Sequence, residues 1–269
     1  MNYTEKGSKL YLFSIVLVAV IGGLLFGYDT AVISGAEKGL QAFFMGADFE
    51  YTDAIHGITS SSALIGCIIG SAVSGFFASR LGRKNSLFLA GILFFLSALG
   101  SYYPEFLFFE HGVPSYSLLV AFNFYRVLGG VGVGLASAIC PMYIAEIAPS
   151  NIRGTLVSWN QFAIIFGMLV VYFVNYTIAL QGDAAWLNTI GWRWMFASEI
   201  IPAVLFLSFL MFVPETPRYL VMRGRTEKAL GVLSHLMDQV DAGRELEDIR
   251  NSFKEKAPSM KPYFRFMGT

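Results

Sequence analysis

Charged residues make up only 14% of this 269-residue sequence, whereas soluble domains contain roughly 25%. Hydrophobic residues reach 55% of the chain. This composition predicts an integral membrane protein. The net charge is zero, so the chain has no overall positive field with which to attract nucleic acid, and we expect no nucleic-acid partner.

Cysteine and histidine are also rare. Cys67 and Cys140 both fall in apolar runs, so we expect neither a structural disulfide nor a thiolate metal ligand, and we interpret both as small packing residues. The three histidines, His56, His111 and His235, are too scattered to indicate a metal site. We therefore expect no metal and no bound cofactor.

Long apolar runs, in contrast, are abundant. A hydrocarbon core about 30 Å thick needs about 20 residues of helix to cross it. Six runs reach this length and are bounded by charged or turn residues: 10–33, 54–79, 85–103, 115–143, 154–180 and 192–213. Their short connections imply antiparallel neighbours. We therefore predict an all-α integral membrane protein whose residues 1–213 form a bundle of six transmembrane helices.

Lysine and arginine are divided unequally between the two sets of connecting segments. One set contains Lys6, Lys9, Arg80, Arg83, Lys84, Arg153, Arg218, Arg223 and Arg225, whereas the other clearly holds Lys38 alone. The second set carries the acids Glu37, Asp48, Glu50, Asp53, Glu105, Glu110 and Asp183. Positive charge marks the cytoplasmic side. We therefore expect a multi-pass protein of the cytoplasmic (inner) membrane with both termini in the cytoplasm.

The first apolar run follows lysines, as a signal peptide would. It continues past a typical hydrophobic region, however, and no small-residue cleavage site ends it, so we expect it to remain as a span. Residues 214–269 differ from the rest. The segment 226–240 places Leu230, Leu233, Met237 and Val240 on one helical face, and 244–256 repeats the pattern before Pro258 and Pro262 break it. We predict short cytoplasmic amphipathic helices there.

Glycine is frequent inside the predicted spans, where it lowers helix propensity and therefore needs a packing reason. Small residues recur every four positions at Gly66, Gly70 and Ser74 in the second span and at Gly130 and Gly134 in the fourth. This spacing predicts close helix contacts. The stretch GGVGVG (129–134) is superficially like a nucleotide-binding loop, but it lies within a helix and follows no strand.

Three charged residues, Asp29, Arg126 and Glu199, lie inside predicted spans. At about 1.5 Å of rise per residue, Asp29 is about 28 Å from the inner start of its span, Arg126 about 16 Å and Glu199 about 10 Å from the outer ends of theirs. All three can meet in the outer half, with the arginine between two carboxylates. One bound proton would neutralise the cluster, and Asp29 is the candidate carrier. The alternative is a fixed structural ion pair.

Nine segments carry a resemblance to a known family: FGYDTAVISG (26–35), SALIGCIIG (62–70), RLGRK (80–84), YRVLGGVGVGLAS (125–137), PMYIAEIAP (141–149), RG (153–154), NQFAIIFG (160–167), GWRWMFASE (191–199) and PETPR (214–218). Together they resemble the amino-terminal half of the sugar porters of the major facilitator superfamily, and among these the bacterial D-xylose/proton symporters. The resemblance implies a transporter rather than an enzyme, with a proton as the coupling ion and a sugar and the lipid bilayer as partners.

The resemblance also assigns a cytoplasmic gate, a group of charged residues that locks the inner helix ends. Its members are Arg83, Glu146, Arg153, Glu215 and Arg218. Exposed ion pairs contribute about 0–1 kcal/mol each, so several must act together. The alternative is incidental pairing of positive-inside charge. Ser79 departs from the family pattern, because a carboxylate is common at this position.

For the sugar, the resemblance implies hydrogen bonding by Gln161 and an aromatic wall from Phe26. Met168 stands where xylose-like members can carry a second glutamine. Without the resemblance, ordinary helix packing would explain these residues equally well. Family facilitators that move sugar downhill lack an acid at the Asp29 position, so Asp29 favours symport.

Several alternatives remain open. The chain could be an uncoupled sugar facilitator, or a transport-inactive sugar-binding or sensor fragment. An intramembrane aspartyl protease is disfavoured, because its two acids must share a proton, whereas Arg126 is expected to separate Asp29 from Glu199. The family grips its sugar between two six-helix halves, and this sequence holds one. We therefore expect the carboxy-terminal half to be missing, and no saturable uptake by these 269 residues alone.

Overall fold

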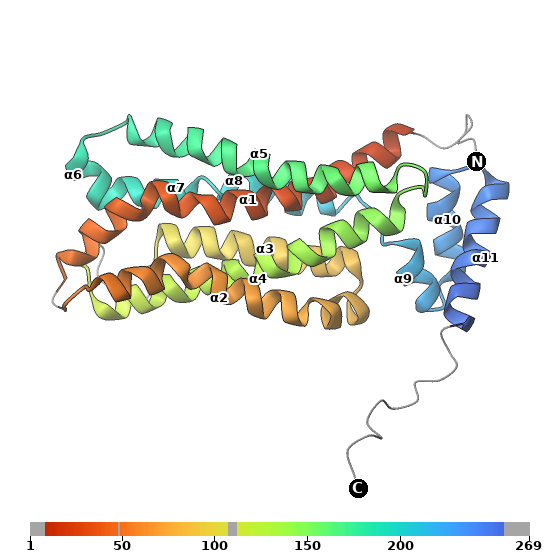
Figure 1. Cartoon of the computed structure of the whole chain (residues 1–269), viewed down its shortest axis with the longest axis horizontal. Helices are drawn as coiled ribbons and strands as arrows, with labels where there is room; N and C mark the ends of the chain where they lie inside the picture. The colour runs from red at the N-terminus through yellow and green to blue at the C-terminus, as the bar shows by residue number, and fades with distance from the viewer. Residues whose placement is uncertain (1–8, 48, 107–111, 256–269) are drawn as a thin grey trace, which may run out of the picture. The chain divides into compact units, whose positions relative to one another are not determined.

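A computed structural model describes residues 9–47, 49–106 and 112–255 of the chain (Figure 1). Within these ranges it is helical, with short turns between the helices. Several residues considered above lie outside the described ranges, namely Lys6, Asp48, Glu110, His111, Pro258 and Pro262. The chain forms two compact units, one of Leu12–Glu215 and one built from the residues before Leu12 and after Glu215.

Six segments of the described chain are long and apolar enough to cross a membrane. Five are continuous helices: α1 (Lys9–Met45), α2 (Asp53–Arg80), α3 (Arg83–Tyr102), α4 (Tyr116–Ile147) and α5 (Arg153–Ala179). The sixth consists of four consecutive pieces: α6 (Ala184–Trp186), the π-helical turn η1 (Leu187–Gly191), α7 (Trp192–Ala197) and α8 (Ile200–Leu210). Helices α1 to α5 run lengthwise along the bundle (Figure 1).

Two of these helical segments differ from the expected spans. Helix α1 continues to Met45, well beyond the predicted end at residue 33. Its extension is amphipathic: Leu40 and Phe44 are fully buried, whereas the charged pair Glu37 and Lys38 that interrupts the apolar run faces outward. The sixth segment begins at Ala184 rather than 192. Its first turns contain polar residues, which a helix accepts but which the search for apolar runs left out.

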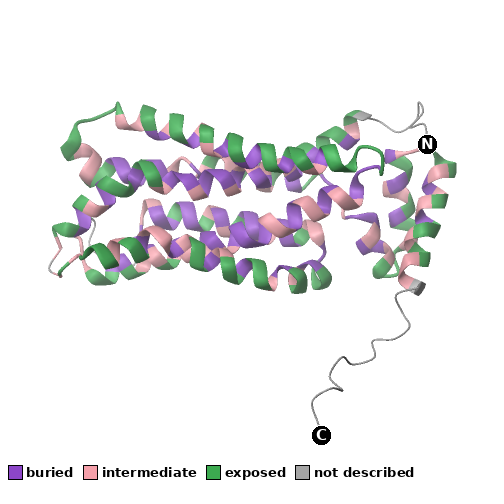
Figure 2. Ribbon diagram, in the orientation of Figure 1, coloured by how far each residue is buried: buried purple, intermediate pink, exposed green. Residues whose placement is uncertain are grey.

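The predicted close helix contacts are confirmed. A Cβ atom on Gly66 would lie 2.1 Å from the Val127 carbonyl oxygen, and one on Gly130 would lie 1.9 Å from that of Ala63. Helices α2 and α4 therefore approach each other backbone to backbone, which only glycine allows at these points. Helix α5 packs against α1 in the same way but leaves a long exposed face (Figure 2).

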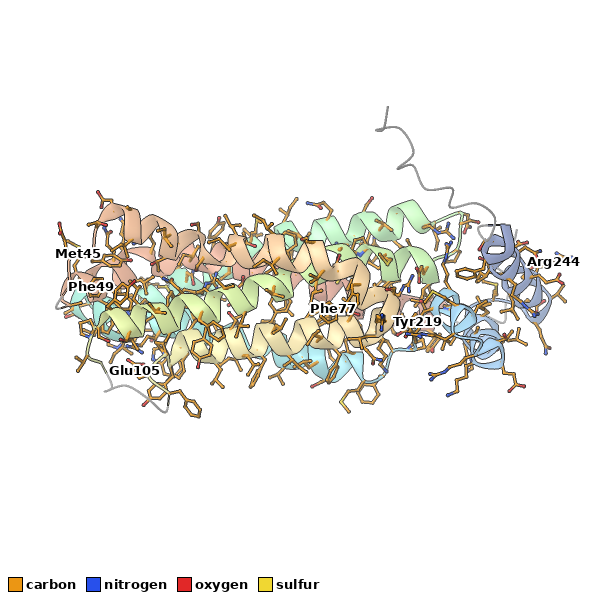
Figure 3. The ribbon with its side chains drawn as sticks, turned by 90° about the horizontal axis from the view of Figure 1, so that it is seen from below. Met45, Phe49, Phe77, Glu105, Tyr219 and Arg244 are labelled. Atoms are coloured by element: carbon orange, nitrogen blue, oxygen red, sulfur yellow. The ribbon has the colours of Figure 1, made fainter. Side chains whose placement is uncertain are left out.

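The two ends of the bundle can be defined by their residues. Met45, Phe49 and Glu105 lie together at one end, which we call the Glu105 end, whereas Phe77 lies toward the other (Figure 3). An aromatic cluster fills the Glu105 end, where the rings of Phe122 and Trp192 are 5.8 Å apart. The opposite end, where α2 and α4 finish and α3 and α5 begin, is called the Glu146 end.

The second unit contains α9 (Pro217–Met222), α10 (Thr226–Leu236) and α11 (Gln239–Glu255). Leu220, Leu233 and Leu246, one from each helix, pack in its core. The helix predicted over 226–240 is present but ends at Leu236, because the backbone is extended at Met237. The Asp238 carboxylate then accepts a hydrogen bond from the backbone N–H of Gln239 at 2.7 Å, and α11 begins.

Candidate proton and sugar site

Asp29 on α1 and Arg126 on α4 form a buried ion pair in the middle of the bundle. The guanidinium donates from Nη1 to Asp29 Oδ1 at 2.6 Å and from Nη2 to the Asp29 backbone carbonyl at 3.3 Å. The exposed fractions are 0% for Asp29 and 2% for Arg126. The Phe196 ring also lies 5.1 Å from the guanidinium carbon. Water is therefore excluded, and the pair depends on its own hydrogen bonds.

Glu199 lies in the short interruption between α7 and α8 and is also fully buried. The charges of Asp29 and Arg126 both act on its carboxyl group. The carboxyl groups of Glu199 and Asp29 are close enough to interact as a side-chain hydrogen bond, but neither oxygen of Glu199, nor Asp29 Oδ2, meets a hydrogen-bond donor within the described chain. The sequence analysis expected Arg126 to bridge and separate the two acids, but Arg126 bonds Asp29 alone, and the two carboxyl groups interact directly.

A hydrogen bond fixes the helix interruption to α1. The Ser198 hydroxyl donates to the Met195 carbonyl at 2.5 Å, so the Tyr28 hydroxyl must be the donor in its 2.7 Å bond to Ser198 Oγ. Tyr28 and Asp29 are adjacent on α1, just as Ser198 and Glu199 are adjacent in the interruption. This bond therefore holds the two acids on facing segments.

The three residues assigned to the sugar lie on α1 and α5, two helices that contact each other. Phe26 and Met168 are partly buried, whereas Gln161 is exposed on the outer face of α5. A Cβ atom on Gly27 would lie 1.9 Å from the Ile164 carbonyl oxygen, so the helices touch at this level. None of the three residues lines the cavity of about 600 Å³ beside Trp186 and Trp194, or the one of about 490 Å³ beside Tyr116.

Three of the five proposed gate residues meet at the Glu146 end. Arg83 donates from Nη2 to Glu146 Oε1 at 2.7 Å and from Nη1 to the Ala78 carbonyl at 3.2 Å, which joins α2, α3 and α4. Glu215 accepts the backbone N–H groups of Arg83 and Lys84 at 3.0 and 3.1 Å. A carboxylate on the first amides of a helix is favourable there.

The other two proposed gate residues make different contacts. Arg153, at the start of α5, is exposed and donates from Nε to the Ala148 carbonyl at 3.4 Å. Arg218 belongs to the second unit, where its guanidinium lies 5.7 Å from the Phe253 ring centre. The geometry therefore supports a cluster of Arg83, Glu146 and Glu215.

A second buried ion pair, between Glu105 and Arg193, was not singled out from the sequence. Arg193 donates from Nη1 to Oε2 at 2.7 Å and from Nη2 to Oε1 at 2.5 Å. The Gly112 backbone N–H adds a third bond to the carboxylate at 3.2 Å. Burial raises the pKa of Glu105, but the hydrogen bonds and charge of Arg193 outweigh it, so this pKa lies below its ordinary value. An arginine just inside a predicted span was the available signal.

The described residues contain no group of three or more His, Cys, Asp or Glu placed to hold a metal ion. Cys67 and Cys140 carry free thiols. Cys140 is buried, and its sulfur would lie 2.5 Å from a Cβ atom on Gly22. This contact agrees with the interpretation of Cys140 as a small packing residue.

The six membrane-length helices and the buried charged group agree with the sugar-porter resemblance of the sequence. The family model described as sugar (and other) transporter matches residues 15–268, so the chain belongs to this family. The family consists of transporters and not of enzymes, as the sequence resemblance implied, and the helices of this chain form part of a major facilitator fold.

Individual relatives show which members of the family this chain resembles. The chain is 53% identical over 251 residues to the D-xylose-proton symporter of Escherichia coli K12, covering 90% of this chain and 51% of that protein. It is 38% identical to the glucose facilitated diffusion protein of Zymomonas mobilis, covering 93% and 53% respectively. A solved structure of the xylose transporter XylE from E. coli, in a partially occluded inward open conformation, superimposes with a TM-score of 0.88 at 52% identity, covering 92% of this chain and 60% of that one. The chain spans about half the length of the curated relatives it matches.

Proposed function

We propose that this chain forms the amino-terminal six-helix half of a proton-coupled monosaccharide symporter that carries D-xylose or a similar pentose or hexose. The protein lies in the cytoplasmic membrane with the Glu105 end outside and both termini inside. The identity to a D-xylose-proton symporter supports the substrate class. The lysine and arginine residues at the Glu146 end support the orientation.

The observation that carries this proposal is the buried group of Asp29, Arg126 and Glu199. It holds two carboxyl groups and one guanidinium, and three of its four carboxyl oxygens meet no hydrogen-bond donor in the described chain. An unpaired carboxylate is costly in a dry interior, so one proton stabilises the group. With Asp29 bound to Arg126, Glu199 is the acid that holds the proton in this arrangement. Asp29 takes it over when the pair with Arg126 opens.

Proton binding and sugar movement are linked through the net charge of this group. Without the proton the group carries one negative charge, which resists the rearrangement that exposes the site to the other side. With the proton it is neutral. Phe26, Gln161 and Met168 lie on α1 and α5. Gln161 is exposed, so it can reach a sugar held against a second half. At the Glu146 end, Arg83, Glu146 and Glu215 stabilise the closed inner side.

The test uses a complete transporter, made by joining this chain to the carboxy-terminal half of the E. coli D-xylose-proton symporter. In proteoliposomes with an imposed proton gradient, Asp29→Asn is expected to abolish uphill D-xylose accumulation while sugar exchange between equal concentrations continues. The amide keeps the size of the side chain and cannot carry the proton. Retained proton-driven accumulation by this variant contradicts symport through Asp29.

Two controls accompany this test. Asp183→Asn changes a carboxylate that caps α6 by accepting the Trp186 backbone N–H at 2.8 Å, and it should leave accumulation unchanged. The 269-residue chain alone should show no saturable uptake, because the family binds its sugar between two halves. Measured uptake by the chain alone contradicts the need for a second half.

A further inference from the structure

A line of hydrogen-bonded side chains begins at the Glu105 end and leads into the bundle from α1 and α2 to α4. It consists of Glu37, His56, Tyr51, Thr59 and Asn123, which we call the His56 network. Neither the sugar site nor the gate uses any of these residues. The network begins at a carboxylate whose side chain is 50% exposed and passes to a histidine side chain that is only 13% exposed.

Both ring nitrogens of His56 are engaged. Nε2 lies 3.1 Å from Glu37 Oε1, and Nδ1 lies 3.1 Å from the Tyr51 hydroxyl. An ionised carboxylate can only accept, so Nε2 carries a hydrogen. In neutral His56 the Tyr51 hydroxyl therefore donates to Nδ1. Once His56 binds a proton, Nδ1 becomes a donor as well, and Tyr51 must accept from it.

The same reversal continues inward. The Thr59 hydroxyl is within hydrogen-bonding reach of the Tyr51 phenol, and burial raises the pKa of the phenol more than this neighbour lowers it, so the phenol keeps its hydrogen. Thr59 is fully buried and accepts from Asn123 Nδ2 at 3.4 Å. Asn123 Oδ1 is buried without a hydrogen-bond partner in the described chain. When Tyr51 donates to Thr59, the threonine hydroxyl needs an acceptor, and this oxygen supplies it once the amide turns.

Asn123 stands one helical turn before Arg126 on α4, so the two side chains are neighbours on the same helix. A turn of the Asn123 amide exchanges a partial negative atom for a partial positive one close to the guanidinium that binds Asp29. The network thus ends beside the proton-coupling group without belonging to it.

We propose that His56 and Glu37 form a second proton-binding site, and that proton binding there reverses the hydrogen bonds leading through Tyr51 to Asn123. The ligand is a proton from the outer solution. No covalent bond changes except the N–H bond formed at Nδ1. Because the proposal links this site at the Glu105 end to the group that contains Asp29, it rests on the proposed symport function.

Other titratable groups near the site are mainly acidic. The elements around His56 carry Glu37 and Lys38 on α1, Glu50 and Tyr51 in the connection, Asp53 on α2 and Tyr116 at the start of α4. Of these, Glu37 and Tyr51 bond His56 directly. Histidine is the side chain whose charge changes most readily between pH 5 and 8.

The direct test is nuclear magnetic resonance of the 269-residue chain in nanodiscs, labelled at histidine and asparagine. Signals are assigned by their loss in His56→Gln and Asn123→Ala. The Asn123 side-chain amide is expected to shift with the same midpoint as the His56 ring between pH 5 and 8. In Thr59→Val, His56 should still titrate while the Asn123 amide no longer moves. His235→Gln, a matched change in the second unit, should alter neither signal.

Two results overturn the proposal: an Asn123 amide that does not respond to pH in the unchanged chain, or one that still follows His56 in Thr59→Val. The link to transport is tested in the joined transporter, where His56→Gln should shift the dependence of proton-driven uptake on outer pH and leave sugar exchange unchanged. An unshifted pH profile contradicts that link. Failure of the symport proposal is recognised separately, by uphill accumulation in Asp29→Asn, which leaves the resonance result standing.

Discussion

Glu105 with Arg193 and Asp29 with Arg126 are both buried arginine–carboxylate pairs, but they differ in how completely the carboxylates are satisfied. Both Glu105 oxygens accept from Arg193, and Gly112 adds a third bond. Asp29 accepts from Arg126 through one side-chain oxygen, and the neighbouring Glu199 accepts from no donor within the described chain. The first pair has the geometry of a structural ion pair that joins the α3–α4 connection to α7. The second has spare acceptors for a proton.

The largest expected effect on stability comes from the satisfied pair. Glu105→Ala leaves the Arg193 guanidinium buried without its carboxylate, and removal of one partner from a buried pair costs about 3–5 kcal/mol. The free energy of unfolding, measured by denaturant titration of the chain in mixed micelles, should fall by this amount. Glu105→Gln keeps one acceptor, so its free energy of unfolding should lie between those of the unchanged chain and Glu105→Ala. An effect of Glu105→Ala no larger than that of Glu247→Ala, at an exposed site of α11, would show that the Glu105–Arg193 pair does not stabilise the fold.

Lowering the pH should have a somewhat smaller effect on the free energy of unfolding. The pKa of Glu105 lies below its ordinary value of 4.5, because Arg193 outweighs the effect of burial. A lowered folded-state pKa gives stability that is fully present above the ordinary value and is lost as the pH falls through the lowered one. The difference in unfolding free energy between the unchanged chain and Glu105→Gln should therefore shrink from pH 6 toward pH 3. A difference that is constant over this range argues against the pair.

The contrast between the pairs also shows what the sequence could reveal. Asp29 and Arg126 stood out because each interrupts a long apolar run, and rise per residue alone put them at compatible depths. Glu105 follows Tyr103 and Pro104 in a connecting segment, where a carboxylate is ordinarily solvated, so its burial depends on the packing of α7 against α3. The hydrogen-bond partner of Arg126 could not be predicted either. Depth could place Glu199 near Arg126 but could not decide which acid the guanidinium binds.

Helix ends show the same limit. The six spans followed from hydropathy, since each must cross about 30 Å of hydrocarbon. The extension of α1 to Met45 depends on Leu40 and Phe44 meeting a partner, which periodicity alone could not supply. The break at Met237 depends on Asp238 capping α11. Tertiary contacts and caps, rather than propensity, decide these boundaries.

Glu215 offers a third carboxylate for comparison, because it is satisfied by backbone N–H groups at the start of α3 instead of by arginine alone. Glu215→Ala removes this cap and should cost about 1 kcal/mol of unfolding free energy, as is typical of caps. Glu227→Ala, in the first turn of α10, is the exposed control. Equal effects of the two changes would show that the α3 amides gain nothing from Glu215.

The smallest expected effect on stability belongs to Glu199, although its effect on coupling should be among the largest. Glu199→Gln places a neutral amide where the structure leaves two carboxyl oxygens without partners, so unfolding free energy should change by less than about 1 kcal/mol. In the joined transporter the same change fixes the site in the neutral state. Sugar exchange should therefore continue while uphill accumulation disappears, the opposite of Glu105→Gln, which should weaken folding and retain coupling. A loss of stability by Glu199→Gln as large as that of Glu105→Ala would mean that Glu199 is held as an anion by a partner, and the two pairs would no longer differ in kind.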